Sequence, residues 1–375
     1  MSIRVLRSSF AFPWFLCALF LMPVGTGAAR AGEKVEPPAR FNSTLFTFDG
    51  RVFLTSGEGR TSASRGGPMI PDFLNDLWEF SPKRDEWGEL IKESDLPETH
   101  FGHTREIRNG QAIVFEPGFQ SDDSIENLLY LSVNDLCFVR QEKSEHPDKV
   151  SGTTLVDGPD KALIGSGVPG LSMPAISSAR FVDDETLTYG PPIPLVRGLV
   201  NGLGAYSSAF DLYLLLLGFD DTFAFNSLIQ AVADDADSNG LTGVSSAPLP
   251  SGPEFPETRA FMAFAQRGSR LVIYGGQRFS ILGDVWEIDV DRLAEDVQGG
   301  GPVGADAFRK LGELPPRAAA SMVFLDDDTL LIFGGFNAEG ELLQDTRVIS
   351  LSGFVPFFED DFETGDTDRW SSVQP

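Results

Sequence analysis

The chain has 375 residues, with 29 Lys and Arg against 55 Asp and Glu, and a formal net charge of -26 at pH 7. A surface this acidic repels nucleic acids and anionic membranes, so it argues against a partner of either kind. It favours cations or basic partners, and a protein or a carbohydrate is the expected ligand.

The first 31 residues have the pattern of a secretory signal. Arg4 and Arg7 precede an uncharged run at 10–24, and small residues end at Ala29-Arg30-Ala31. This order predicts cleavage of residues 1–31 and a secreted or periplasmic location. An uncleaved anchor is the alternative, but the run is shorter than the about 20 residues of a membrane span. No later segment is longer, so no membrane span is expected after cleavage.

Cleavage would leave a single cysteine, Cys137, and a short linker at 32–39. One cysteine cannot form an intramolecular disulfide, even in an oxidising compartment. The fold is therefore expected to depend on burial of apolar side chains.

An apolar run that ends in glycine recurs along the rest of the chain. Its copies lie at residues 52–57, 112–118, 162–167, 213–218, 271–276 and 330–335. The final glycines are about 50–60 residues apart, a period typical of repeat folds. Six structural units are therefore predicted within residues 40–353.

Several units continue with an acidic, an apolar and an aromatic residue. Asp76-Leu77-Trp78 and Asp284-Val285-Trp286 are the clearest copies, and residues 179–189 carry a weaker one. A further β-rich segment follows each, as at 87–90 and 308–311. These segments are predicted to be the third and fourth strands of each unit.

The double glycines Gly275-Gly276 and Gly334-Gly335, together with the downstream tryptophans, resemble the motifs of the kelch repeat family. The resemblance covers residues 40–353 and implies an all-β fold, a kelch-type β-propeller with six blades of four strands. Units two to four depart from the pattern, as at Leu217-Gly218, which makes the blade count weaker than the fold class. No helical period is evident outside the signal.

The packing of such a fold can also be predicted. Glycine at the strand ends would allow backbones to crowd together. The rings of Trp78 and Trp286 would fill the wedge between neighbouring sheets. The acidic segment 324–329 is expected to be an exposed hairpin turn.

A basic residue opens four of the units: Arg40, His100, Arg259 and Arg317. Two interpretations are open. The four could form a ring around a channel mouth that holds a carboxylate or a sugar acid. Alternatively, each could tie strand ends to nearby acids. Further candidates for ligand binding are the loop residues after the glycine ends, because loops on a rigid scaffold carry most binding. These are Arg60, Phe119, Arg278, Phe279, Phe336 and Asn337.

No cofactor is expected, although calcium is an alternative. Asp235, Asp237 and Asn239, followed by Gly240, match the first half of a calcium loop. Ser246 stands where the loop needs its last acid, so an acidic insertion between the third and fourth strands of unit four is the competing interpretation. A glycine-rich segment at 298–302 is predicted to be a flexible loop.

The sequence gives less support to a metal site built on histidines. His100 and His103 could be metal ligands, and the kelch resemblance brings a copper oxidase to mind. That activity needs separated histidines and a tyrosine cross-linked to cysteine, a set that this chain does not reproduce. Both histidines are expected to be structural residues of a first strand.

The acidic C-terminal tail, residues 354–375, resembles a short Phe-Glu-x-Gly-Asp segment with a following Trp-Ser that ends many exported bacterial proteins. Surface association and an inert docked tail are both open. Because no catalytic set stands out, the expected function is an exported, non-catalytic recognition protein. The alternative is a carbohydrate-active propeller enzyme, such as a sialic-acid mutarotase.

Overall fold

The computed structural model describes residues 35–48, 50–60, 71–74, 76–91, 190–191, 193–199, 201–220, 222, 224–234 and 241–354, and eight strands between residues 103 and 189 by their backbone. The predicted signal sequence, the candidate calcium loop and residues 355–375 of the tail lie outside these residues.

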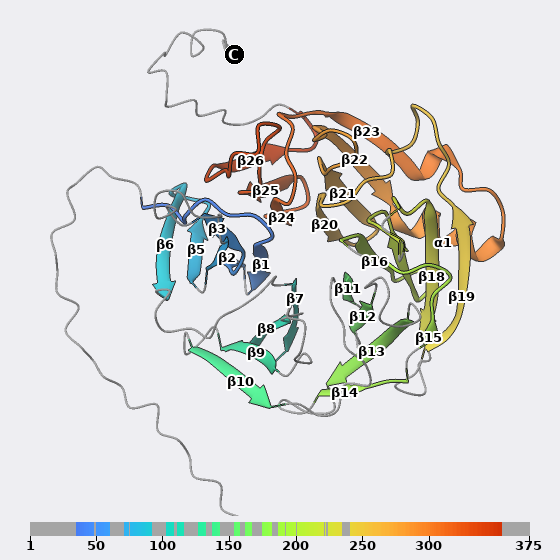
Figure 1. Cartoon of the computed structure of the whole chain (residues 1–375), viewed down its shortest axis with the longest axis horizontal. Helices are drawn as coiled ribbons and strands as arrows, with labels where there is room; N and C mark the ends of the chain where they lie inside the picture. The colour runs from blue at the N-terminus through green and yellow to red at the C-terminus, as the bar shows by residue number, and fades with distance from the viewer. Residues whose placement is uncertain are drawn as a thin grey trace, which may run out of the picture. The chain divides into compact units, whose positions relative to one another are not determined.

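The chain forms antiparallel sheets, which we number 1 to 6 in chain order (Figure 1). Sheet 1 contains β1 (Thr44–Phe48), β2 (Arg51–Thr55), β5 (Leu77–Ser81) and β6 (Glu86–Ile91), and β3 (Glu58–Arg60) pairs separately with β4 (Pro71–Phe73). Sheet 2 contains β7 (His103–Arg108), β8 (Gln111–Phe115), β9 (Asn127–Ser132) and β10 (Cys137–Glu142). Sheet 3 contains β11 (Thr154–Asp157), β12 (Ala162–Ser166), β13 (Ala175–Phe181), β14 (Leu187–Tyr189) and β15 (Ile193–Pro194).

The second half of the chain repeats this arrangement. Sheet 4 contains β16 (Leu203–Ser207), β17 (Leu212–Leu216), β18 (Leu228–Asp234) and β19 (Leu241–Pro248). Sheet 5 contains β20 (Ala263–Arg267), β21 (Arg270–Tyr274), β22 (Asp284–Asp289) and β23 (Phe308–Glu313). Sheet 6 contains β24 (Ser321–Phe324), β25 (Thr329–Phe333) and β26 (Thr346–Ser350).

The all-β prediction is therefore confirmed, and each glycine-ended run that was predicted from the sequence overlaps the second strand of its sheet. The predicted third and fourth strands of sheets 1 and 5 are confirmed as β5, β6, β22 and β23. The uniform count of four strands is not: sheet 6 has three strands among the described residues, and β15 adds a fifth to sheet 3. No helix in the described part of the chain is long and apolar enough to cross a membrane.

Neighbouring sheets meet along their first strands. β7 lies beside β1 and β11, β11 beside β16, and β24 beside β20 and β1. Between sheets 4 and 5, the side-chain amide of Gln266 in β20 bonds to both the N–H and the carbonyl of Tyr206 in β16, at 2.9 and 2.6 Å. The last sheet thus contacts the first: Ser321 donates its hydroxyl to the carbonyl of Ser43 at 2.5 Å.

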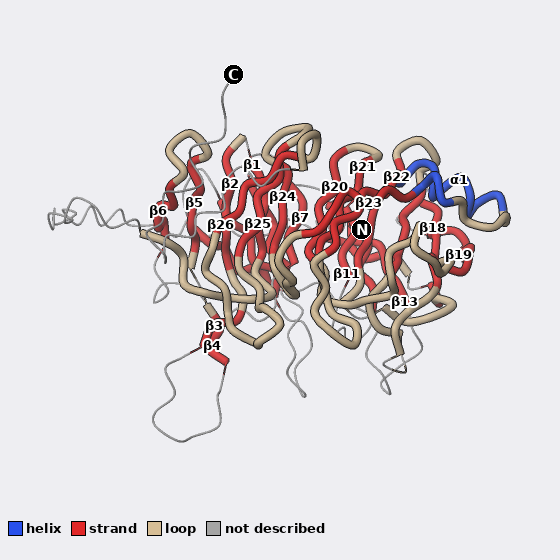
Figure 2. Tube along the Cα trace, turned by 90° about the horizontal axis from the view of Figure 1, so that it is seen from above, coloured by secondary structure: helices blue, strands red, loops and turns tan. Residues whose placement is uncertain are grey.

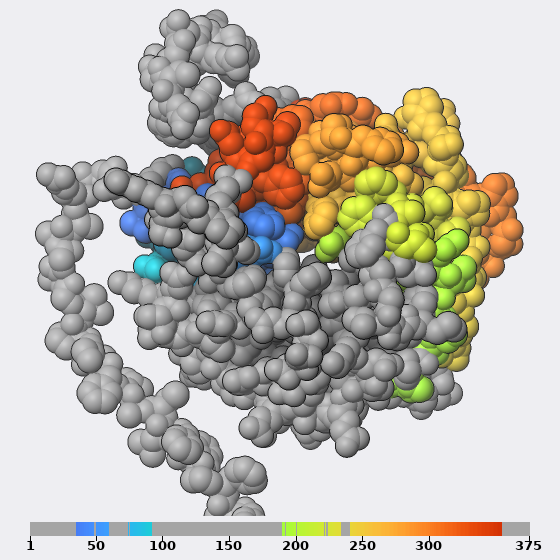
Figure 3. Space-filling view, in the orientation of Figure 1, coloured from blue at the N-terminus to red at the C-terminus, as the bar shows by residue number. Residues whose placement is uncertain are grey.

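The tryptophans pack between sheets, as predicted. Trp78 is buried in sheet 1 against Leu331 and Phe333 of sheet 6. Trp286 of sheet 5 is buried in a cluster that includes leucines of sheet 4. The described surfaces of sheets 4, 5 and 6, coloured from green to red, lie against one another in Figure 3. The acidic turn also forms as predicted, with Asp326 accepting two backbone N–H groups between β24 and β25.

A helix, α1 (Val290–Gly299), lies between β22 and β23, where the sequence predicted no helix. Asp289 caps its start by accepting the N–H groups of Asp291 and Arg292, both at 3.1 Å, and Gly300 ends it in the left-handed conformation. The spacing of its buried residues is helical. They are Val290, Leu293, Ala294 and Val297.

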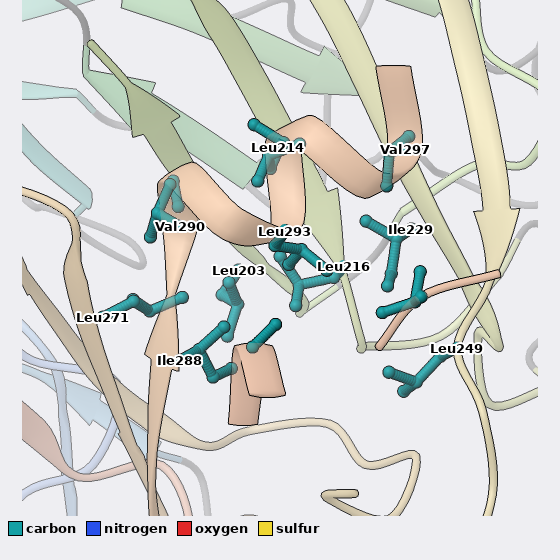
Figure 4. Close-up of a cluster of buried hydrophobic side chains, with 14 of the residues drawn as sticks. Leu203, Leu214, Leu216, Ile229, Leu249, Leu271, Ile288, Val290, Leu293 and Val297 are labelled. Atoms are coloured by element: carbon teal, nitrogen blue, oxygen red, sulfur yellow. The ribbon is translucent and has the colours of Figure 1, made fainter. Parts of the chain in front are cut away.

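This prediction was wrong because the helix period was not recognised in so short a segment. The helix lies beside β18 and β19 of sheet 4 (Figures 1 and 2). Its apolar side chains point toward Leu214, Leu216 and Ile229 of that sheet (Figure 4). Helix α1 therefore fills part of the space between sheets 4 and 5. Of the loop predicted at 298–302, residues 298–299 belong to the helix and residues 300–302 lie outside helix and strand, before the short 3-10 turn η2 (Ala305–Ala307).

The ends of the second strands explain the glycine pairs. Gly275-Gly276 and Gly334-Gly335 all have positive φ, and a Cβ on Gly275 would overlap the carbonyl oxygen of Arg317 in the next sheet. Ser56 and Leu217 hold the same left-handed position in sheets 1 and 4, with φ of 60° and 61°. The backbone therefore adopts the left-handed conformation at this position in every one of these four sheets, even where the residue is not glycine.

Ser56→Gly should raise the free energy of unfolding by about 1–2 kcal/mol. The left-handed conformation disfavours a residue with a Cβ, and the buried Ser56 hydroxyl has no hydrogen-bond partner in the described structure. The added freedom of glycine in the unfolded chain offsets part of this gain. Urea unfolding measures the difference. Gly57→Ala is the reverse control and should destabilise, because its Cβ would lie 2.8 Å from the carbonyl oxygen of Phe41.

Candidate binding surface

The first of the predicted basic residues is completely buried. The Arg40 guanidinium donates to both carboxylate oxygens of Asp76, at 2.6 and 2.5 Å, and to the carbonyl of Ser56 at 3.0 Å. Asp76 also accepts the indole N–H of Trp78 at 2.7 Å. The acid–apolar–tryptophan motif of the sequence is therefore the acceptor half of a buried ion pair.

Sheet 5 repeats this arrangement. Arg259 is fully buried, contacts both carboxylate oxygens of Asp284 and donates to the carbonyl of Gly275 at 3.0 Å. The indole N–H of Trp286 donates to Asp284 at 2.6 Å. Burial alone would raise the pKa of Asp284, but the hydrogen bonds and charge of Arg259 hold that pKa below its usual value.

Sheet 6 carries a variant of the same junction. Arg317 donates to Asp345 at 2.6 Å and to the carbonyl of Gly334 at 2.9 Å. Arg347 takes the place of the tryptophan and donates to the same carboxylate at 2.7 Å. Burial would raise the pKa of Asp345, but the two arginines lower it.

The main chain of each arginine reaches the preceding sheet. Its carbonyl accepts the N–H of the glycine that ends the second-strand run there. The three bonds run from Gly218 to Arg259 at 2.6 Å, from Gly276 to Arg317 at 2.8 Å and from Gly335 to Arg40 at 2.7 Å. Each arginine therefore fastens its own sheet with its side chain and the neighbouring sheet with its backbone.

Sheet 4 lacks both charges of this junction. Leu199 holds the arginine position, two residues before the left-handed Asn201, and Asn226 holds the aspartate position. The Asn226 amide itself donates to the carbonyls of Leu217 and Leu228, at 3.3 and 3.1 Å. The arginine and the acid are thus replaced together, as expected for two halves of one buried pair.

These contacts favour the structural interpretation of the basic residues. Arg40, Arg259 and Arg317 are at most 2% exposed, and each is bound to an acid of its own sheet. None of the three has a guanidinium free for an added carboxylate, which favours strand ties to nearby acids over a ring of basic groups at a channel mouth. His100 lies outside the described residues, as do Phe119 and the candidate calcium ligands Asp235, Asp237 and Asn239; Arg60 is described by its backbone in β3.

Sheet 1 has a second buried acid, Glu58, near the junction of Arg40 and Asp76. Glu58 follows the glycine of its sheet, at the position where sheets 4, 5 and 6 carry Phe219, Gln277 and Phe336. It is 6% exposed, and the side-chain amide of Asn42 is 3.5 Å from its carboxylate. Burial raises the pKa of Glu58, and this weak hydrogen bond only partly lowers it.

Glu58→Gln should stabilise the chain at pH 8 and have little effect at pH 4. Because the folded-state pKa is raised, the protonated carboxyl is favoured on folding below the unfolded pKa, and that contribution is lost as the pH rises through the folded pKa. Glutamine stays neutral throughout and is already present as Gln277 in sheet 5. Thermal unfolding at the two pH values measures the effect, and equal shifts at both would contradict it.

Phenylalanines gather where sheets 4 and 5 present the ends of their second strands. Phe219 and Phe225 belong to sheet 4, with ring centroids 5.0 Å apart. Phe261 of sheet 5 contacts Phe219 edge-on at 5.9 Å, and Phe279 contacts Phe225 edge-on at 6.2 Å. We call these four residues the phenylalanine surface. The sequence predicted only Phe279, although Phe219 follows its glycine just as the predicted Phe336 follows Gly335.

Phe279 is the most exposed large apolar side chain in the described part of the chain, at 91%. The Arg278 guanidinium lies over its ring, 5.2 Å from the centroid, and donates to Glu257 at 2.6 Å. Arg278 is therefore a support for an exposed ring rather than a free cation.

The other predicted loop residues lie in sheet 6. Phe336 is half-buried and contacts Phe41 of sheet 1 edge-on at 5.9 Å. Asn337 shapes its loop by accepting the N–H groups of Glu339 and Glu341. Both residues are thus occupied in holding the loop and the contact with sheet 1.

No group of three or more His, Cys, Asp and Glu side chains that could hold a metal ion occurs among the residues that the structure describes. No protein-family model matches the chain, and no curated protein matches it either.

Proposed function

We propose that the six sheets are the blades of a kelch-type β-propeller and that the chain is an exported, non-catalytic recognition protein. The equivalent arginine junctions support the repeat, since each links one sheet to the next by the same bonds. The contact between Ser43 and Ser321 supports a ring in which sheet 6 meets sheet 1. The pattern of residues 1–31 supports export.

The observation that carries the binding function is the phenylalanine surface. Apolar rings on loops above a rigid scaffold are typical of a recognition site, and Phe279 is almost fully exposed. The competing mutarotase would need free basic groups for a sugar acid. Arg40, Arg259 and Arg317 are buried in ion pairs, which favours binding over catalysis.

Anomer exchange of a sialic acid tests this choice. The mature chain, residues 32–375, is mixed with N-acetylneuraminic acid, and exchange between its anomers is followed by NMR. A non-catalytic protein leaves the exchange rate equal to that in buffer. An exchange rate faster than that in buffer would contradict the non-catalytic proposal and favour the mutarotase.

A further inference from the structure

Phe279 is held in place although it is exposed. Its loop is closed by a bridge between Gln277 and Ile281, and Arg278 is fixed by Glu257 at 2.6 Å while lying over the ring. Phe225 packs against the ring from sheet 4. Little side-chain freedom is then lost when a partner covers Phe279, which is the condition for a strong anchor residue.

The chemistry of the surface favours a protein over a sugar. All four rings are phenylalanine, so none offers the hydroxyl or indole N–H with which tyrosine and tryptophan bind polar ligands. A carbohydrate needs several placed hydrogen-bond groups around an aromatic ring. Of the charged neighbours, Arg278 is already paired with Glu257, and Arg197 lies 3.9 Å from Asp220. What the surface presents is apolar area.

The end of the sheets that carries the phenylalanine surface is acidic on balance among the described residues. Because neighbouring strands of these sheets are antiparallel, the start of the first strand, the end of the second and the start of the third lie at the same end of each sheet. The phenylalanine surface lies at this end. The described segments at this end carry five exposed glutamates and, outside the buried junctions, two arginines. The glutamates are Glu36, Glu254, Glu257, Glu339 and Glu341. With a net charge of -26 for the chain, these acids favour a cationic partner.

We propose that the phenylalanine surface binds a cationic segment of another protein, with Phe279 packing against apolar side chains that alternate with Lys and Arg. This inference rests on the proposed recognition function and names its partner class. The apolar contact supplies affinity, and the acidic surroundings select the positive segment and speed its association.

Selection of a displayed library of random short peptides on the immobilised mature chain tests the inference. Enriched peptides are expected to combine Lys or Arg with Phe, Leu or Trp. Their synthetic copies should bind Phe279→Ser about tenfold more weakly than the unchanged chain. Ser280→Ala, next to the ring in the same loop, is the matched control and should bind as tightly as the unchanged chain. Raising the salt concentration should weaken binding.

The outcomes separate the inference from the function on which it rests. Acidic or uncharged peptides, or peptides that bind Phe279→Ser as well as the unchanged chain, would overturn the partner class and leave a recognition protein. Self-association that Phe279→Ser abolishes, seen by light scattering, would replace the partner with a second copy. Binding of neutral polysaccharides alone would replace it with a sugar. Catalysed anomer exchange would overturn the recognition function itself.

Discussion

Arg259→Leu is expected to lower the free energy of unfolding by about 3–5 kcal/mol. The change removes both bonds to Asp284 and leaves that carboxylate partly buried without its cation. It also removes the donor to the carbonyl of Gly275. Chemical denaturation of the mature chain measures the loss. A loss below about 1 kcal/mol would contradict this prediction, because it is the contribution expected of a solvent-exposed ion pair.

Two controls isolate the junction. Arg267→Leu removes a pair with Asp327 that is largely exposed and should cost no more than about 1 kcal/mol. The double change Arg259→Leu with Asp284→Asn recreates the neutral pair of Leu199 and Asn226 in sheet 4. It should be more stable than Arg259→Leu alone, because no charge remains buried.

The ion pair of Arg259 and Asp284 makes the free energy of unfolding depend on pH. The pKa of Asp284 is lowered in the folded chain, so its contribution is present above the unfolded carboxyl pKa and is lost as the pH falls through the folded one. The difference in stability between the unchanged chain and Arg259→Leu should therefore shrink as the pH falls below about 4.

Trp286→Ala should destabilise by about 3–5 kcal/mol. The ring is 4% exposed and lies in the cluster that joins sheets 4 and 5 with α1, so its removal leaves a large cavity. Its N–H donor to Asp284 is lost as well. Thermal and urea unfolding report the change.

Trp286→Phe separates the two contributions. It retains most of the apolar volume and loses the donor, which should cost about 1–2 kcal/mol. Phe279→Ser, in the same sheet but with an exposed ring, should change stability by less than about 0.5 kcal/mol. If Trp286→Ala matched Phe279→Ser, the tryptophan would not be part of the core.

The fold was largely predictable because its signals are local. A glycine at a left-handed strand end and an aspartate two residues before tryptophan each occupy a fixed place, so the repeat appears in the sequence as a spacing. Helix α1 was missed although Asp289, the i, i+3, i+4, i+7 apolar spacing and Gly300 were all present. Ten residues are too few for a helical period to stand out among so many short apolar runs.

The site was less predictable because it depends on contacts between distant residues. A repeated arginine suggests either a ligand ring or a buried pair, and only the position of Asp76 or Asp284 beside it distinguishes the two. The phenylalanine surface joins Phe219 to Phe261 across two sheets. The spacing of residues along the sequence does not predict that contact.

A cross-link between the first and last sheets tests the central claim most directly, namely that equivalent sheets follow one another until sheet 6 meets sheet 1. The hydroxyl oxygens of Ser43 and Ser321 are 2.6 Å apart. In the protein of residues 32–375 with Cys137→Ser, Ser43→Cys with Ser321→Cys should form an intramolecular disulfide in mild oxidant, seen by mass spectrometry of the digested protein. The matched pair Ser43→Cys with Ser245→Cys, which reaches to β19 of sheet 4, should stay reduced. Free thiols in the first pair, or equal cross-linking of both pairs, would contradict the arrangement.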